Sequence, residues 1–514
     1  MRSLSYEKIS LCSLAFLSSL PVLSDDENRQ KPNVLLIYAD DLGYGDVLCN
    51  SYGYDIVTNI NTLSENGLAF ANAYSVASTS TPSRYSLLTG EYAWRRKGTD
   101  VAAGNAAMIV PPEKMTVADV FKSAGYKTAA IGKWHLGLGG VTAGQDWNGE
   151  ISPSPADIGF DEHYIMAATG DRVPCVFIEN GRVASYDASA PIEVSYVRNF
   201  EGEPTGKDNP ELLYNLKSSH GHNMSIVNGI GRIGYMKGGG AALWKDENIA
   251  DSITARAVDF IHTNKDERFF LYFAANDVHV PRFPHERFRG VSGMGLRGDA
   301  IAQFDWSVGQ LVAALRDCGI LDNTLVILTS DNGPVLDDGY VDMAEDLVGS
   351  HSPTGGLRGG KYSAFEGGTR VPFIVSYPGV VPNGCTSGAL VSQVDFLPTM
   401  AALVGVDLPV APAIDGEEQL AAWLGKDGCG RRYVVSQASN HTLSLRTADW
   451  KYISPKGGPV MVPWGPKIET GYSATPQLYY MGGDCAETVN VAALYPALVE
   501  SMERLLQAEK QKVK

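Results

Sequence analysis

Carboxylates, an amide and histidines directly follow four predicted strands of this sequence. The strands and the residues after them are Val34–Ala39 with Asp40 and Asp41, Thr128–Ile131 with Lys133 and His135, Phe269–Asn276 with His279, and Leu325–Ser330 with Asp331 and Asn332. A single Asp after a strand is commonly a turn former or a helix cap. Because the carboxyl ends of parallel strands meet at one edge of a sheet, we expect the four sets to converge on one site.

The oxygen atoms in this set indicate a metal ion. The candidate ligands are Asp40, Asp41, Asp331 and Asn332. They offer only hard oxygen atoms, which suit calcium best and magnesium second. Three carboxylates around a dication leave about one negative charge, so an anionic substrate needs further positive charge nearby. The candidates to supply it are Arg84, Lys133 and Lys361.

One short segment resembles the signature of the type I sulfatases. It reads Ser80-Thr81-Pro82-Ser83-Arg84 and is followed by Leu87-Leu88-Thr89-Gly90. In that family the pattern is Cys or Ser, any residue, Pro, Ser and Arg, and then a Leu-Thr-Gly segment. Other family blocks match, in the expected order, residues 40–46, 132–137, 159–161, 330–333 and 365–372. The resemblance covers nearly the whole mature chain, and it implies an alkaline phosphatase-like fold and sulfuric ester hydrolysis.

The resemblance also implies a mechanism. The first signature residue is oxidised to Cα-formylglycine, whose hydrate binds calcium and attacks sulfur in line, after which a base helps to expel sulfate. The implied roles are Ser80 as modified nucleophile and metal ligand, Arg84 as holder of the formylglycine and the sulfate, Lys133 as orienting residue, His135 as base, His279 as acid toward the leaving sugar oxygen, and Lys361 beside His279. The metal and the cations stabilise charge on the sulfuryl oxygens.

Serine rather than cysteine at position 80 has an implication of its own. In this family the oxygen-dependent maturing enzyme acts on Cys, whereas the radical maturase of anaerobic bacteria also accepts Ser. We therefore expect a radical-type maturase as partner, in a gut-type anaerobe. If Ser80 is never oxidised, the alternative is a non-catalytic protein that binds sulfated glycans.

The substrate class is indicated by Asp171 and Arg172, in a segment that resembles bacterial sulfatases acting on 6-sulfated galactose or N-acetylgalactosamine. A carboxylate can accept a hydrogen bond from a sugar hydroxyl, and a guanidinium can donate one to it. We therefore expect Asp171 and Arg172 to bind the axial O4 hydroxyl of a galacto-configured sugar. A buried loop ion pair is the alternative. His220-Gly221-His222 could suggest a second metal, but a substrate contact through His222, or plain loop structure, fits better. A phosphonate or phosphodiester hydrolase of the same superfamily is the competing activity.

The order of predicted strands and helices indicates the fold that positions these candidate site residues. Continuous apolar strands alternate with amphipathic helices, which indicates an α/β fold with a large, mostly parallel sheet between helices. The helices are Thr116–Ala124, Ile249–Asn264 and Ala300–Cys318. A polar insertion, residues 186–244, is too long for a simple connection and is expected to shape the substrate pocket.

The pattern changes near residue 425. Four short strands and a closing helix predict a smaller antiparallel subdomain over residues 426–514, after a catalytic domain over residues 25–425. They are Tyr433–Ser436, Thr442–Arg446, Trp450–Ile453, Gln477–Tyr480 and Tyr495–Lys514. Trp464 could border the pocket from this side, although core packing is the default for an aromatic residue.

Composition and the first residues bear on location and partners. The 514 residues are 44% hydrophobic and 19% charged, with a net charge of −16, which disfavours nucleic acids and anionic membranes as partners. Residues 1–24 resemble a signal peptide, with Arg2 and Lys8 before a short apolar run. We therefore expect export to a periplasm, without stable membrane insertion. Seven scattered cysteines do not form a dense disulfide framework.

Overall fold

A computed structural model describes residues 31–47, 56–408 and 414–512. The predicted signal peptide lies outside these residues. Among them, no helix combines the length and the apolar character that a membrane span requires. Five cysteines fall within them, and all five are free thiols.

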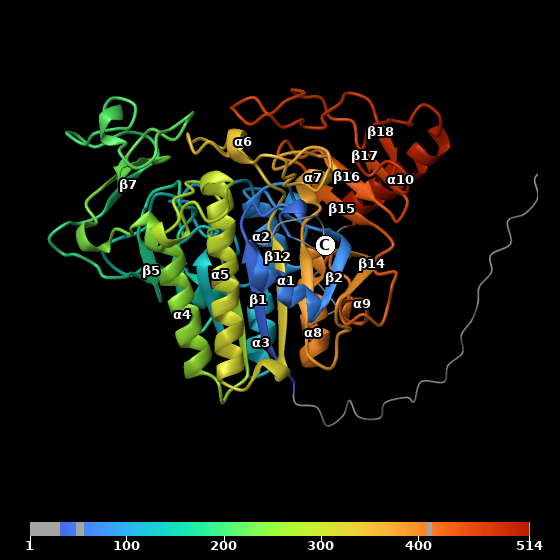
Figure 1. Cartoon of the computed structure of the whole chain (residues 1–514), viewed down its shortest axis with the longest axis horizontal. Coiled ribbons are helices and arrows are strands. Elements are labelled where there is room, and N and C mark those ends of the chain that lie inside the picture. Colours follow the sequence, from blue (N-terminus) through green and yellow to red (C-terminus); the bar gives the residue numbers. More distant parts are fainter. Residues whose placement is uncertain (1–30, 48–55, 409–413, 513–514) are drawn as a thin grey trace, which may run out of the picture.

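A ten-stranded sheet forms the centre of the molecule (Figure 1). Its order is β14-β2-β13-β12-β1-β11-β3-β4-β5-β6. The five strands from β12 to β4 run parallel, whereas β13, between β12 and β2, is antiparallel to both neighbours. The strands are β1 (Asn33–Ala39), β2 (Leu68–Tyr74), β3 (Lys127–Lys133), β4 (Glu162–Met166), β5 (Phe177–Glu179), β6 (Arg182–Val183), β11 (Phe269–Ala274), β12 (Thr324–Ser330), β13 (Phe373–Ser376) and β14 (Cys385–Ser392).

Both faces of this sheet are buried, as the continuous apolar strands predict. Alternate residues of β1 enter two separate cores: Leu36 joins one and Leu35 the other. Helices α2, α3, α8 and α9 cover the first face, and α1, α4 and α5 cover the second. Their bounds are α1 (Thr58–Glu65), α2 (Ser80–Thr89), α3 (Val117–Ser123), α4 (Ile249–Thr263), α5 (Gly295–Asp317), α8 (Phe396–Val404) and α9 (Leu420–Trp423). The predicted α/β sandwich is confirmed.

The C-terminal part forms a four-stranded antiparallel sheet in the order β15-β16-β17-β18. Its elements are β15 (Val434–Gln437), β16 (Leu443–Arg446), β17 (Trp450–Ile453), β18 (Gln477–Tyr480) and the helix α10 (Pro496–Gln511). Val76 and Val394 of the larger part share a hydrophobic cluster with Leu445 and Leu506. The small sheet therefore packs directly on the larger part, at the upper right in Figure 1.

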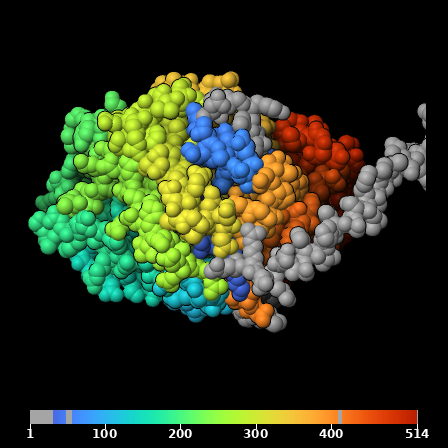
Figure 2. Space-filling view, turned by 60° about the horizontal axis from the view of Figure 1, so that its bottom comes forward, coloured from blue at the N-terminus to red at the C-terminus, as the bar shows by residue number. Residues whose placement is uncertain are grey.

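The polar insertion has little regular structure. It contains two short antiparallel pairs, β7 (Glu193–Ser195) with β10 (Tyr235–Lys237) and β8 (Ile226–Val227) with β9 (Ile230–Gly231). Buried Arg232 fixes it through an ion pair with Asp246 at 2.6 Å and a hydrogen bond to the carbonyl of Gly170. Figure 2 shows the cyan-to-green segments and the red C-terminal part at opposite ends of this view, with blue and orange segments between them. Two further short helices, α6 (Ala344–Leu347) and α7 (Glu366–Thr369), lie in the loops after β12.

Candidate active site

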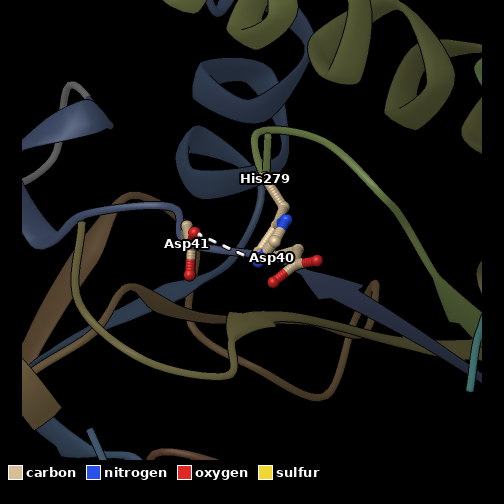
Figure 3. Close-up of side chains that lie close together, drawn as sticks. All are labelled: Asp40, Asp41 and His279. Atoms are coloured by element: carbon tan, nitrogen blue, oxygen red, sulfur yellow. Dashed lines mark ion pairs between the residues drawn. The ribbon is translucent and has the colours of Figure 1, made fainter. Parts of the chain in front are cut away.

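The four predicted strands end at one edge of the large sheet and bring their polar residues together there. β1 lies between β11 and β12, and β3 pairs with the far side of β11. Oxygen atoms of Asp40 and Asp41 and a ring nitrogen of His279 lie within 4.8 Å of one another. Figure 3 shows His279 reaching from the loop after β11 toward the two aspartates, with its Nε2 3.9 Å from Asp41 Oδ2.

Asp331 and Asn332 complete this acidic cluster. Asp331 Oδ1 accepts a hydrogen bond from the Asp41 amide at 3.2 Å, and Asn332 Nδ2 donates to Asp41 Oδ1 at 2.7 Å. Asp40 Oδ1 and Asn332 Oδ1 are buried and have no hydrogen-bond partner. Buried acceptors without a donor are costly, and a cation would satisfy both oxygens. The donor set therefore fits a hard metal ion, as its residue types predict.

The three predicted cations surround these carboxylates. Arg84 donates to Asp331 from Nη2 at 2.8 Å, Lys133 pairs with Asp40, and Lys361 Nζ lies 2.8 Å from Asp41 Oδ2. All three side chains are almost fully buried. Charges out of water interact strongly, so this arrangement stabilises negative charge that arrives from the cavity.

Burial and these ion pairs shift the pKa of several groups. Burial raises the pKa of Asp40 well above its usual value, and the pairing with Lys133 does not offset this. Burial also acts to raise the pKa of Asp41, but Lys361 and Lys133 outweigh it, so the net shift is downward. The pKa of Lys361 is raised because Asp338 and Asp41 outweigh its burial. The pKa shifts of the two neighbouring carboxylates thus have opposite directions. A nearby dication would stabilise the ionised form of Asp40 in particular.

Ser80 is the first residue of α2, and all ten residues of this helix are buried. A helix N-terminus favours anions, so an anion that approaches Ser80 meets the positive end of the helix dipole. Ser80 Oγ lies 3.1 Å from His135 Nδ1. His135 Nε2 is 2.9 Å from the Ala102 carbonyl, which can only accept, so Nε2 carries the proton and Nδ1 accepts from Ser80. Burial and Lys133 lower the pKa of His135 well below its usual value.

A cavity of about 830 Å³ opens above Ser80 and contains the predicted substrate residues. Asp171 Oδ2 lies 2.9 Å from His222 Nε2, and Arg172 Nη1 lies 3.0 Å from Asp171 Oδ1. Burial acts to raise the pKa of Asp171, but Arg172 and the hydrogen bond from His222 outweigh it and hold the carboxyl ionised. The buried ion pair, one of the two alternatives for Asp171 and Arg172, is therefore present, at the wall of the cavity.

His222 is held by Asp171 and the His220 carbonyl rather than as part of a second metal site. Gly339 makes room for it: a Cβ there would lie 1.8 Å from His222 Nδ1. Within the described residues, the metal-type cluster at Asp40, Asp41 and His279 does not include His220 or His222. The polar insertion thus shapes the pocket, as its length predicts.

Sequence reasoning missed Asp338, which lies between two site residues. Its carboxylate is 2.9 Å from Lys361 Nζ and 2.8 Å from the Tyr362 hydroxyl. Asp338 stands seven residues beyond the strand-end motif at Asp331, in a loop without periodicity, so no local pattern marks it. Trp464 lines the same cavity, which makes the core-packing default wrong for this residue.

Comparisons with known proteins agree with this geometry. Residues 32–406 match the family model described as Sulfatase. The chain is 49% identical over 487 residues to an N-acetylgalactosamine-6-O-sulfatase of Bacteroides thetaiotaomicron, covering 94% of both chains. It is also 30% identical to human arylsulfatase A, over 92% of this chain and 87% of that protein.

Solved structures give the same result. A 6S-sulfatase from a study of glycosaminoglycan metabolism in Bacteroides thetaiotaomicron has a TM-score of 0.91 at 48% identity, covering 94% of this chain and 100% of the other. A phosphonate monoester hydrolase of Agrobacterium radiobacter has a TM-score of 0.57 at 18% identity, which shows a shared fold alone.

Proposed function

Because this chain belongs to the sulfatase family and is a sulfuric ester hydrolase, we propose that it removes the 6-O-sulfate of N-acetylgalactosamine or galactose in sulfated glycans. One observation carries the proposal: Ser80 and His135 line the same cavity as Asp171, Arg172 and His222. A sugar that contacts these last three residues can direct its sulfate toward Ser80. The name of the relative with 49% identity supports the same substrate class.

The proposed reaction requires Ser80 to be oxidised to formylglycine by a radical-type maturase. The hydrated aldehyde supplies a nucleophile that can later release sulfate by elimination, which an ordinary serine cannot do. His135 holds Ser80 through Nδ1 and is oriented to take a proton from that position. Arg84 and Lys133 hold the nucleophile and the sulfate against the carboxylate cluster.

The leaving sugar oxygen needs a proton, and His279 is the proposed donor. Its Nδ1 is 2.7 Å from the Val280 carbonyl and keeps its proton in that hydrogen bond. Nε2 must therefore be protonated as well, so the imidazolium form of His279 is the one that donates a proton to the leaving oxygen. Lys361, paired with Asp41 and Asp338, lies beside it.

The proposed metal is calcium, with magnesium second. Asp40, Asp41, Asp331 and Asn332, together with the modified residue 80, would hold it. A bound dication would supply Lewis-acid stabilisation of negative charge in the reaction. The single acidic cluster of the described residues favours a sulfatase over a hydrolase built on two metal ions. Export to a periplasm is part of the proposal and depends on residues 1–24.

The test is a panel of 6-, 4- and 3-sulfated galactose and N-acetylgalactosamine with enzyme matured by a co-expressed radical maturase. Released sulfate and intact-peptide mass at Ser80 are measured. We expect release from the 6-sulfated sugars, a peptide lacking two hydrogens, and no release by Ser80→Ala. Faster release from 4- or 3-sulfated sugars would overturn the substrate, and faster cleavage of phosphate or phosphonate esters would overturn the activity.

A further inference from the structure

The cavity above Ser80 is large and reaches the surface of the molecule. Its volume of about 830 Å³ lies in the upper part of the range for pockets that bury drug-sized ligands, roughly 300–1,000 Å³. The inner residues Ser80 and Lys361 are 3% and 4% exposed. Trp464 and Val101, which line the same cavity, are 46% and 44% exposed. The cavity therefore continues from the reacting centre to an outer chamber at the surface.

One wall of the outer chamber is a hairpin formed by residues 456–473, which connects β17 to β18. It closes through bridges Lys456–Ser473 and Met461–Glu469 and carries Trp464 at its tip. The hairpin is fixed to the segment that carries Lys361: Ala364 donates to the Thr470 carbonyl, and Arg358 pairs with Glu469 at 2.8 Å. The position of Trp464 is thus set relative to the reacting centre.

Trp464 lies one layer outward from the site described above. Lys361 contacts Asp338, Asp338 contacts the Tyr362 hydroxyl, and the Tyr362 ring meets the Trp464 ring edge to face at 4.9 Å. His220 packs on Gly465, where a Cβ would lie 2.2 Å from its ring, so the insertion meets the hairpin beside Trp464. The indole is therefore an exposed aromatic surface that lines the cavity and is supported by Tyr362.

The charged side chains that line the cavity limit which sugars can bind in the outer chamber. Among the described residues that line the cavity, the lysine and arginine side chains are Lys361 and Arg172, and both are engaged by carboxylates. At the mouth, His441 pairs with Asp100 at 3.2 Å, and Asp100 is the more exposed partner, at 68% of its side chain. A uronate would find no unengaged guanidinium or ammonium there, and the outer imidazoles of His220 and His441 already face the carboxylates of Asp337 and Asp100.

We infer that the outer chamber is a second sugar subsite, which packs the apolar face of a neutral hexose or hexosamine, the neighbour of the sulfated sugar, on Trp464. Aromatic rings give ligand pockets large apolar contact at low entropic cost, and a few polar groups fix orientation. Ser439 and Asn440 supply such groups on the cavity wall. The inference deepens the proposed function and rests on it, because the sulfated sugar must first occupy the inner part.

The test compares three substrates of the matured enzyme. They are 6-sulfated N-acetylgalactosamine alone, the same sugar joined to a neutral hexose, and the same sugar joined to a hexuronate. For the wild type we expect kcat/KM for the neutral disaccharide to exceed that for the hexuronate disaccharide about tenfold. Trp464→Ala should lower kcat/KM for the neutral disaccharide about tenfold and leave the monosaccharide within twofold. Trp464→Phe should restore most of the loss.

The matched control is Tyr480→Ala, since Tyr480 is equally exposed, at 47%, but packs on Trp450 outside the cavity. It should change none of the three values. The subsite would be overturned if Trp464→Ala lowered kcat/KM equally for the monosaccharide and the neutral disaccharide, or lowered it for neither. Equal or faster turnover of the hexuronate disaccharide by the wild type would overturn its neutral character. If the wild type releases sulfate from none of the three, the proposed 6-sulfatase activity fails instead.

Discussion

At the scale of single residues, the two proposed proton-transfer histidines are held as opposite tautomers by backbone carbonyls. His135 Nε2 donates a hydrogen bond to the Ala102 carbonyl, and His279 Nδ1 donates one to the Val280 carbonyl. One ring therefore presents Nδ1 to Ser80 and the other presents Nε2 toward the acidic cluster. A backbone carbonyl can only accept a hydrogen bond. Each histidine would therefore lose a buried hydrogen bond if its ring proton moved to the other nitrogen.

Also at this scale, the two oxygens of the acidic cluster that lack a hydrogen-bond donor predict a stabilising metal. Adding calcium to chelator-treated protein should raise the thermal unfolding midpoint, by the equivalent of about 2.7 kcal/mol at 100 times the dissociation constant, and magnesium should do so less. Asp40→Asn should lose this response, measured by calorimetry without substrate. Asp266→Asn, which changes an exposed carboxylate paired with Lys265, is the control and should keep it. A thermal unfolding midpoint that neither calcium nor magnesium changes would contradict the metal assignment.

Gly339 predicts a selective effect on substrate binding. Gly339→Ala places a methyl group against His222 Nδ1, so we expect kcat/KM for a 6-sulfated sugar to fall about tenfold or more through misplacement of His222. Gly290→Ala is the matched control, because Gly290 has a φ of 81°, nearer the 108° of Gly339, and has nothing within 4 Å of its Cβ. Both variants carry the backbone strain of a side chain at positive φ. Equal kinetics for the two variants would show that His222 does not bind the sugar.

At the scale of elements, the sequence predicts the strands that carry chemistry closely, and it predicts β17 and β18 of the small sheet with their observed bounds. The strand predicted from Phe269 begins where β11 begins, and β1, β3 and β12 each begin one residue before their predicted starts. The antiparallel β13, which interrupts the parallel order, has no counterpart in the prediction, since a short apolar run carries no information on strand direction. Helix α5 begins at Gly295, five residues before the predicted start. Its glycine-rich first turn argues against a helix, but buried Arg297 anchors it by an ion pair with Asp46.

Some site residues can be found from sequence motifs and others cannot, and the elements that carry them explain the difference. Residues next to strand ends, such as Asp41 and His279, are placed by the sheet and are therefore predictable from the sequence. Asp338 and Trp464 reach the pocket through long loops whose course depends on tertiary contacts. Local sequence patterns do not encode such contacts, so only the folded chain shows that these two side chains border the pocket.

His163, on β4, predicts a pH dependence of stability. Its Nε2 accepts a hydrogen bond from the Gly181 amide at 2.8 Å, which requires a neutral ring, and burial lowers its pKa to about 4. The unfolded chain, with a pKa near about 6.5, binds the proton more readily, so stability is complete above about pH 6.5 and is lost as pH falls toward 4.

His163→Gln should remove about 2–3 kcal/mol of this pH dependence. The measurement is the free energy of unfolding in urea at pH 7.5 and 4.5 for both proteins. The exposed His262, near the end of α4, offers the control His262→Gln, which should leave the wild-type slope intact. A slope unchanged by His163→Gln would contradict the assignment.

At the scale of the whole molecule, a buried ion cluster joins the small sheet to the large part. Lys451 of β17 lies 3.1 Å from Glu366 and 2.9 Å from Glu487, and all three side chains are almost fully buried. Tyr74 of β2 donates to Glu366 at 2.6 Å. Burial raises the pKa of Glu487 to about 7, so its charge depends on solution pH.

Lys451→Met should destabilise the protein by about 3–5 kcal/mol at pH 8, because it leaves the buried carboxylate of Glu487 without its cation. Glu366 keeps its ion pairs with Arg370 and Arg446. The loss should be smaller at pH 5, where Glu487 is protonated. Unfolding in denaturant, followed by tryptophan fluorescence and by circular dichroism, measures both. Lys467→Met removes an exposed ion pair with Glu345 and should change stability little. Equal effects of the two substitutions would show that the cluster does not join the two parts.

The walls of the cavity come from two different sources. The inner wall belongs to strand ends of the large sheet, whose positions are fixed by a core on both faces. The outer wall belongs to loops, among them the polar insertion and a hairpin between two strands of the small sheet. Insertions or exchanges in that hairpin can change length and composition without disturbing the strand ends. Reaction chemistry and glycan choice can therefore evolve at different rates in this molecule. An engineer could replace the tip of the hairpin, residues 462–466, to redirect the enzyme toward another neighbouring sugar while keeping Glu469 and Thr470, which hold the segment of Lys361.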